Sequence, residues 1–197
     1  MQRLATHRSA VRSHARLPSL MQEGFTAIEL MVVVAIVGVL AALAAPSFTP
    51  LLERWRVRQA NEALQSSLYL ARSEAIKRGG GVTIRKLPNN TNNCSTAINT
   101  NDWDCGWIVC DSTVNASCVP SGKVLQRYDA PQKVQISRAK GGETIAVDRW
   151  GAISGTYVGF SVVPSGKSTS DPATRGVCMS SGGRIKATLP EDTPCKS

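Results

Sequence analysis

Residues 24–45 read GFTAIELMVVVAIVGVLAALAA, and this stretch decides the fold of the N-terminal part of the chain. From Phe25 onward it is apolar except for Thr26 and Glu29. A helix of these 21 residues is about 30 Å long, which matches the hydrocarbon thickness of a bilayer. A carboxylate within such a span costs a few kcal/mol, which makes Glu29 a candidate functional residue. The alternative is a plain single-span anchor in which Glu29 reaches the interface.

The residues before this span are basic. Four arginines precede it with one acid, Glu23: Arg3, Arg8, Arg12 and Arg16. The positive-inside rule therefore places residues 1–24 in the cytoplasm and the chain after residue 45 outside. The only histidines are His7 and His14, so Ser-His-Asp and Cys-His catalysis and histidine-bound zinc or haem are excluded from the rest of the chain. The net charge of +9 favours acidic partners such as nucleic acid, anionic lipid or an acidic protein surface.

The segment Gly24-Phe25-Thr26-Ala27-Ile28-Glu29-Leu30 closely resembles the processing site of type IV prepilins and type II secretion pseudopilins. The resemblance implies that residues 1–24 are a leader, which a prepilin peptidase of the inner membrane removes by cutting after Gly24. It also implies methylation of the new amino group on Phe25. Glu29 is then expected to pair with the N-terminal amine of a neighbouring subunit, because two desolvated opposite charges fix the axial register.

This resemblance predicts a location in the bacterial inner membrane as a single-pass protein, with the head in the periplasm or on an extracellular filament. The leader is long for the class, and Met21 is an alternative start. That start would leave a very short leader without a basic residue, so we retain Met1.

Residues 46–80 continue the helix beyond the membrane half. Pro46 and Pro50 each delete a helical hydrogen bond and predict a kink or a melted turn. Glycines 79–81 end the helix. Its apolar face is formed by residues at helical spacing: Ala60, Leu64, Leu68, Ala71 and Ala75.

Residues 81–197 form a β-rich head, because the apolar period changes from 3.6 to 2 and glycines become frequent. Eight short strands are predicted, at residues 82–86, 106–110, 123–128, 133–137, 144–147, 157–163, 177–180 and 184–188. The predicted fold class is α+β, with a long N-terminal helix packed on an antiparallel, β-sandwich-like head.

One helix followed only by strands resembles the GspH/FimT family of minor pilins and pseudopilins, and implies the type IV pilin-like fold. Trp103-Asp104-Cys105-Gly106-Trp107-Ile108-Val109 resembles the central strand of that family. Arg149-Trp150-Gly151 fits the later turn less specifically. Whatever the function, we expect Trp107 to be a buried packing residue.

The chain has six cysteines, all on the exported side, where they should be oxidised: Cys94, Cys105, Cys110, Cys118, Cys178 and Cys195. Their isolation in the sequence predicts a Cys178–Cys195 disulfide. Three pairings remain for the other four cysteines. Among these we favour Cys94–Cys105 with Cys110–Cys118.

The tail strand carries a candidate DNA-binding site. Two-residue spacing places Arg184 and Lys186 on one face, and Arg175 could join them, as could Lys196. The pattern resembles the Gly-Arg-x-Arg element of DNA-binding minor pilins used in natural competence, with lysine at the second basic position. The nearby acids Glu191 and Asp192 weaken this interpretation. The alternative is a solvated hairpin or a strand edge that packs on a neighbouring minor pilin.

The sequence predicts no enzyme, no cofactor and no metal site. The leading hypothesis is a subunit of the tip or initiation complex of a type IV pilus or a type II secretion pseudopilus, with other pilins as partners. The alternative is a DNA-binding minor pilin for natural transformation. The choice between pilus and secretion system stays open, since both use the same leader and head.

Overall fold

The computed structural model describes residues 24–113, 118, 123–153, 155 and 157–195, and only the backbone of residues 44–47. By its internal contacts the chain divides into two compact units, Met1–Ala44 and Ala45–Ser197. The first unit contributes the N-terminal part of helix α1 (Ala27–Arg78), and the second contains the rest of α1 and the whole β head.

The backbone of α1 is helical at Pro46 and Pro50, so of the two expected outcomes, a kink or a melted turn, the melted turn is absent. Each proline removes a single hydrogen bond, and the turns on either side remain helical. The helical stretches Ala27–Leu43 and Phe48–Arg78 reach the length and apolarity of a membrane span only when they are taken together, and no single helix of the described residues does.

The head contains two four-stranded sheets in which all paired strands are antiparallel. The strands are β1 (Val82–Lys86), β2 (Gly106–Asp111), β3 (Lys123–Asp129), β4 (Val134–Arg138), β5 (Thr144–Val147), β6 (Tyr157–Pro164), β7 (Arg175–Ser180) and β8 (Ile185–Thr188), followed by a short 3-10 helix, η1 (Pro190–Asp192). One sheet has the order β3-β2-β1-β5 and the other the order β4-β6-β7-β8. All eight predicted strands are present, with ends that differ by one or two residues where they differ at all.

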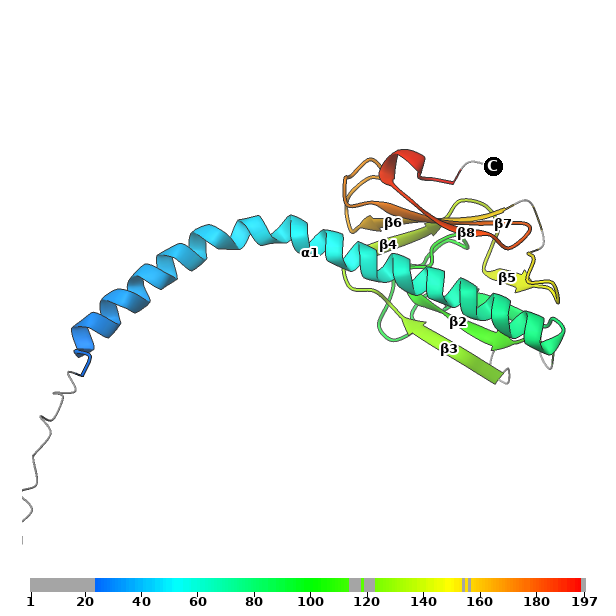
Figure 1. The fold of residues 1–197 in the computed structure, drawn as a ribbon, viewed down its shortest axis with the longest axis horizontal. Coiled ribbons are helices and arrows are strands. Elements are labelled where there is room, and N and C mark those ends of the chain that lie inside the picture. The colour runs from blue at the N-terminus through cyan, green and yellow to red at the C-terminus, as the bar shows by residue number, and fades with distance from the viewer. Residues whose placement is uncertain (1–23, 114–117, 119–122, 154, 156, 196–197) are drawn as a thin grey trace, which may run out of the picture. The chain divides into compact units, whose positions relative to one another are not determined.

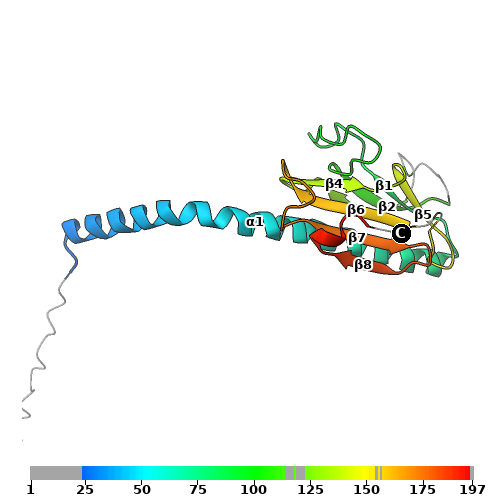
Figure 2. The ribbon, with the colours of Figure 1, turned by 90° about the horizontal axis from the view of Figure 1, so that it is seen from above.

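The larger of two hydrophobic clusters in the described residues lies between the two sheets and the C-terminal part of α1, which runs along one side of both sheets (Figures 1 and 2). The predicted apolar face of the helix is confirmed, since every one of its five residues is buried, together with Val57. The strands add alternate residues such as Ile84, Val109 and Phe160. This shared core fixes the second half of α1 to the head.

The two tryptophans of the central segment anchor that core. Trp107 is fully buried, as expected, and stacks on Tyr128 with ring centroids 4.5 Å apart. Its indole Nε1 donates to Ser67 Oγ on α1 (2.9 Å), and that hydroxyl donates to Gln126 Oε1 on β3 (3.0 Å). Trp103 packs edge-on against Phe160 of the other sheet, with centroids 5.0 Å apart. One segment therefore holds the helix and both sheets together.

Asp104 joins this segment to β4. Its Oδ1 accepts a hydrogen bond from the Ile136 amide (2.6 Å), while the Trp103 amide donates to the Ile136 carbonyl (2.8 Å). The side chain is buried, and this burial raises the pKa of the Asp104 carboxyl above its ordinary value. Asp104 is thus a structural residue of the head.

Three disulfides close loops of the head: Cys94–Cys105, Cys110–Cys118 and Cys178–Cys195. The first joins the polar region of residues 88–102 to Cys105, and Lys86 also stabilises this region. The buried Lys86 ammonium donates to the carbonyls of Ala97 and Asn99. A disulfide and a buried cation therefore hold a segment that is poor in apolar residues.

Candidate assembly and binding surfaces

The first turn of α1 is capped by Thr26. The Glu29 amide donates to Thr26 Oγ1 (3.3 Å), and the Leu30 amide donates to the Thr26 carbonyl (3.2 Å). This is the N-terminal half of a capping box, in which Glu29 occupies the third helical position. A carboxylate in the first turn also interacts favourably with the helix dipole. Glu29 takes part in no ion pair among the residues that the structure describes.

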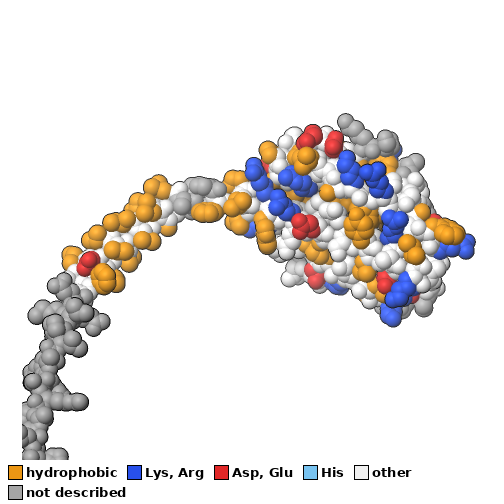
Figure 3. All heavy atoms as spheres, viewed as in Figure 1, with side chains coloured by type: hydrophobic (Ala, Val, Ile, Leu, Met, Phe, Trp, Pro, Cys, Tyr) orange, Lys and Arg blue, Asp and Glu red, His pale blue; other side chains and the backbone are white. Residues whose placement is uncertain are grey.

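The described side chains of the first unit are exposed on every side of the helix, from Phe25 (85% exposed) to Leu43 (71%). Figure 3 shows apolar side chains covering the visible face of this unit, with a single acidic group near its N-terminal end. A helix that is apolar on all sides needs lipid or other helices around it. The described part of this unit therefore needs a partner that buries it, and Glu29 is the only charged residue within residues 24–44.

Several cations of the head have structural roles. Arg78 at the end of α1 pairs with Glu74 (2.6 Å) and with Asp111 of β2 (2.9 Å), and its hydrogen bond is the main cause that lowers the pKa of the Glu74 carboxyl. The buried Arg138 donates to the carbonyls of Gly142 (2.7 Å) and Thr144 (2.8 Å), and burial lowers the pKa of its guanidinium. These groups are committed to the fold, so the net positive charge overstates the number of cations free to bind a ligand.

The tail hairpin exposes two of the predicted binding residues. Lys186 lies on β8 opposite Cys178 of β7, and Arg184 precedes β8, where its amide donates to Ser180 Oγ (3.1 Å). Both side chains are exposed. Strand β8 begins at Ile185, so Arg184 belongs to the hairpin turn and the expected strand start at residue 184 was wrong. Asp192 shares a hollow of about 190 Å³ with Lys186, beside the Cys178–Cys195 disulfide.

Arg175 is not part of the same cluster. Arg175 is the first residue of β7 and lies on the same face of the strand as the buried Val177. Lys186 pairs with Cys178 and therefore lies on the other face of the sheet. The Arg175 guanidinium donates to the carbonyls of Pro172 (3.1 Å) and Thr174 (2.6 Å). The structure thus places Arg184 and Lys186 together but separates Arg175 from them. Lys196 lies outside the described residues.

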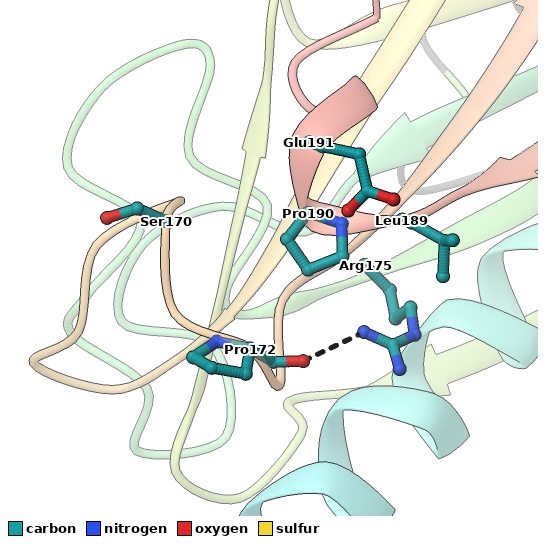
Figure 4. A pocket seen from close by; sticks show the side chains of 6 residues that line it. All are labelled: Ser170, Pro172, Arg175, Leu189, Pro190 and Glu191. Carbon is teal, nitrogen blue, oxygen red and sulfur yellow. Dashed lines mark hydrogen bonds between the residues drawn. The ribbon is translucent and has the colours of Figure 1, made fainter.

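Arg175 instead lines a pocket of about 580 Å³ that we call the proline pocket (Figure 4). Its walls come from the loop before β7 and from the segment at η1: Ser170, Pro172, Arg175, Leu189, Pro190 and Glu191. Half of the Leu189 side chain is exposed (52%), and Glu191 is exposed beside it. The pocket combines proline and leucine surface with one cation and one anion.

Arg72 fastens the tail hairpin to the helix and to the loop that follows β5. Its Nη1 donates to the Gly183 carbonyl (2.7 Å), and a Cβ at Gly183 would lie 2.4 Å from the Gly151 carbonyl oxygen. Gly183 also has a φ of +84°, which favours glycine. The glycine next to Arg184 is therefore needed for close packing of three segments.

The loop after β5 exposes Trp150, which was predicted from the sequence only as part of a turn. Trp150 is 75% exposed, and the Arg149 guanidinium lies 5.9 Å from its ring centroid. Asp148 holds the loop in place, since its Oδ1 accepts from the amides of Trp150 (2.8 Å) and Ala152 (2.9 Å). The signal in the sequence was a tryptophan between an arginine and a glycine, with an Asx-turn residue two positions earlier.

A family model described as "Type II transport protein GspH" matches residues 60–183, which is more than half of the chain. The chain belongs to the GspH family. The matched region begins on the buried face of α1 and ends at the β7–β8 turn, so it contains most of the shared core. The expected membership of the GspH/FimT type is confirmed.

The chain is also similar to curated sequences and to solved structures. Two curated sequences described as "Fimbrial protein", both from Pseudomonas aeruginosa, are 41% identical over 70 residues, which are 36% of this chain and 45% of theirs. The chain thus matches less than half of the length of these relatives. The type IV minor pilin FimU of Pseudomonas aeruginosa superposes with a TM-score of 0.54 and 22% identity over 75% of this chain and 100% of that one. The minor pseudopilin EpsH of Vibrio cholerae gives a TM-score of 0.47 and 14% identity over 68% and 98%.

The likeness to FimU shows the fold, and the expected α+β pilin-type fold is confirmed. Within the described residues no group of three or more His, Cys, Asp or Glu side chains is placed to hold a metal ion.

Proposed function

We propose that this GspH-family chain is a minor pilin or pseudopilin that assembles into the tip or initiation complex of a type IV pilus or type II secretion pseudopilus. One observation supports this proposal most strongly: the single helix α1 has two different surfaces along its length. Residues 25–43 are largely apolar and exposed on all sides, whereas one face of the second half of α1 is buried against a pilin-type head. The chain then acts as a structural subunit and not as an enzyme.

In this role the same apolar surface serves in two surroundings. Before assembly, lipid of the bacterial inner membrane covers residues 25–43, and the head lies on the periplasmic side. A peptidase that cuts after Gly24 exposes the amino group of Phe25. In the filament, helices of other pilins replace the lipid, and the amine and the Glu29 carboxylate of neighbouring subunits pair. Because the amine and the carboxylate neutralise each other only when the two subunits are aligned at one axial position, this pairing fixes the register.

Location in the filament tests this proposal. An epitope-tagged chain is expected in filaments sheared from the cell surface or in overproduced pseudopili, at a small fraction of the major subunit. Immunogold label on these filaments should lie at one end, and deletion of the gene should reduce the number of filaments. Label along the whole filament, or a full number of filaments without the chain, would contradict a role in the tip or initiation complex.

A second candidate function is DNA binding, and the exposure of Arg184 and Lys186 on one hairpin favours it. With Arg175 placed elsewhere and Asp192 beside Lys186, the site offers few phosphate contacts. We expect micromolar or weaker binding to duplex DNA with little sequence preference, because the affinity comes from the release of counterions. About two phosphate contacts give a slope of log K against log salt of about −2.

This candidate predicts that Arg184→Ala with Lys186→Ala abolishes most of the binding and flattens the salt dependence. The unit from Ala45 onward is titrated with duplex DNA at two salt concentrations. Lys167→Ala is a matched control, since Lys167 is an exposed cation in the loop before β7. Equal binding by wild type and double variant, or no binding at low salt, would remove DNA binding from the functions of this hairpin.

A further inference from the structure

The part of α1 that precedes its buried face carries an apolar stripe that the fold leaves uncovered. It consists of Phe48, Leu51, Leu52 and Trp55, and we call it the Trp55 stripe. The spacing of three, four and seven residues from Phe48 places all four side chains on one side of the helix. Each is between 48% and 61% exposed, and none belongs to the hydrophobic clusters of the head. A contiguous apolar surface of this kind commonly marks a contact with another molecule.

The Trp55 stripe points away from the head. Val57, the first core residue of the helix, follows Phe48 by nine residues, which is about two and a half turns. The stripe and the buried face therefore lie on opposite sides of α1. The stripe also has a sharp end, because the same side of the helix carries Gln59 and Glu62 after Trp55, and both are exposed. A partner of the stripe thus contacts the start of this unit on the side turned away from the head.

Basic side chains flank the stripe. Three arginines lie next to its leucines, at three, four or seven residues along the helix: Arg54, Arg56 and Arg58. None of them takes part in an ion pair within the described part of the chain. The only acid among residues 46–61 is Glu53, which precedes Val57 by four residues and so lies on the side of the head. Figure 3 shows hydrophobic and basic side chains close together where α1 reaches the head.

Arg56 also lines a pocket of about 420 Å³ beside the stripe. Trp55 and Gln59 of α1 form one wall, and Tyr128 with residues 130–132 after β3 forms the other. Among the described residues that line this pocket, Arg56 is the only charged one. The pocket therefore matches one anionic group beside an aromatic surface, such as the phosphodiester of a lipid headgroup.

The place of the stripe in the chain favours lipid as its partner. Trp55 follows Ala45, the last residue of the apolar run, by ten residues, which is about 15 Å of helix. At a membrane surface, tryptophan rings lie at the level of the headgroups and arginines are attracted to anionic lipids. An assembly helix such as residues 25–43 of another subunit could cover the stripe, but it would offer three arginines the single carboxylate of Glu29. A bilayer offers both an apolar layer and a phosphate for each arginine.

We propose that the Trp55 stripe and its three arginines bind anionic phospholipid at the periplasmic surface of the inner membrane before the subunit enters a filament. The apolar side chains then lie among the headgroups and the upper acyl chains, and the guanidinium groups pair with lipid phosphates. This part of α1 lies along the surface and holds the head on the side turned away from the membrane. The inference rests on the proposed function, which places the chain in the membrane before assembly, and names a class of lipid as a further partner.

The test measures whether Trp55 enters the bilayer, by the quenching of its fluorescence. The full chain is reconstituted into vesicles of phosphatidylglycerol and a phosphatidylcholine that carries bromine, a short-range quencher, on the acyl chains near the headgroup. The chain has four tryptophans, of which Trp103 and Trp107 are buried. Trp150→Phe therefore leaves Trp55 as the exposed reporter, the matched control Trp55→Phe leaves Trp150, and the double variant gives the background. Most of the Trp55 emission should be lost, whereas the Trp150 emission should persist.

A change of charge tests the class of lipid. In the Trp150→Phe background, vesicles without phosphatidylglycerol should quench Trp55 at least about twofold less, because the attraction between arginine and the anionic surface is lost. A triple variant should show this lower quenching even in anionic vesicles: Arg54→Gln, Arg56→Gln and Arg58→Gln. A matched control removes the same charge from exposed cations elsewhere on the head and should keep the quenching of its parent: Lys123→Gln, Lys140→Gln and Arg149→Gln. The emission of the buried tryptophans shows that each variant is folded.

Unquenched Trp55 in anionic vesicles, equal quenching with and without phosphatidylglycerol, or an equal loss in both triple variants would overturn the inference. Flotation of the chain with the vesicles and its presence in sheared filaments are measured in parallel. If the chain floats with the vesicles and enters filaments but Trp55 is not quenched, the inference fails and the proposed function remains. If Trp55 is quenched but the chain never enters filaments, the proposed function fails instead. A chain that does not float with the vesicles contradicts both.

Discussion

At the scale of single residues, the backbone and the side chain of Glu29 have different roles. The Glu29 amide completes the cap of α1 through Thr26, and the exposed carboxylate remains available to another molecule. Removal of the carboxylate therefore leaves the start of the helix intact. This separation makes the assembly role of Glu29 testable without loss of the local fold.

We expect Glu29→Ala to be processed after Gly24 like wild type but to enter filaments poorly. Loss of the carboxylate leaves a buried amine unpaired at the subunit junction, which costs about 3–5 kcal/mol. The amount of variant in sheared filaments should fall more than about tenfold, by quantitative immunoblot against the membrane pool. Glu29→Asp is the control, since it retains the charge and should incorporate better than Glu29→Ala. Normal incorporation of Glu29→Ala would refute the pairing.

Asp104 shows what sequence reasoning missed at this scale. The segment around it was recognised, but burial of its carboxyl depends on contacts with β4, more than 30 residues away. Its pKa is raised by burial, so the native state binds the proton more tightly than the unfolded state does. The ionised Asp104 therefore lowers the free energy of unfolding as the pH rises from the ordinary carboxyl value through the folded pKa.

Asp104→Asn removes this cost and keeps an oxygen that can accept from the Ile136 amide. At neutral pH the variant should be at least as stable as wild type, and its advantage should disappear as the pH falls below 3.8, the ordinary value. Urea unfolding of the unit from Ala45 onward, at a series of pH values, measures this difference. The pKa values of the Glu74 and Asp111 carboxyls are lowered in the folded state, so protonation of these groups in acid destabilises the fold. This loss is the same in wild type and in Asp104→Asn. A variant less stable than wild type at all pH values would show that the charge itself is needed.

At the scale of elements, the apolar face of α1 and all eight strands follow from periodicity, because burial on one face leaves a local pattern in the sequence. The strand order does not follow from it. β1 pairs with β2 and β5, and β4 pairs with β6, and these pairings depend on long-range packing. The separation of Arg175 from Lys186 has the same cause, since it depends on which face of β7 points to the core.

The disulfide Cys178–Cys195 connects β7 to the segment after η1. The closed loop spans 17 residues, so loss of the bridge should lower the free energy of unfolding by about 3 kcal/mol through the unfolded state. The double variant Cys178→Ala, Cys195→Ala should show this change in urea unfolding, with the core tryptophans Trp103 and Trp107 still buried. A free energy of unfolding equal to that of wild type would contradict this assignment.

At the scale of the whole molecule, the chain combines a unit whose surface requires burial with a unit that already has a closed core. The first was recognisable from the sequence, because residues 25–45 form an apolar run with one acid near its start. The exposure of Trp150 and the proline pocket were not, since the walls of the pocket and the position of the loop after β5 depend on contacts between distant segments. The account therefore depends most on the processing of the N-terminus, which converts the first unit into an assembly helix.

The most direct test is the mass of the intact protein purified from membranes of cells that contain a prepilin peptidase. The account predicts a chain that begins at Phe25 and carries one N-terminal methyl group, and a chain that begins at Met1 when the peptidase gene is deleted. Fragmentation should place the methyl group on the Phe25 amine. A protein that keeps residues 1–24 in the presence of the peptidase, or one cut at another bond, would contradict the assignment of this chain as a pilin-type filament subunit.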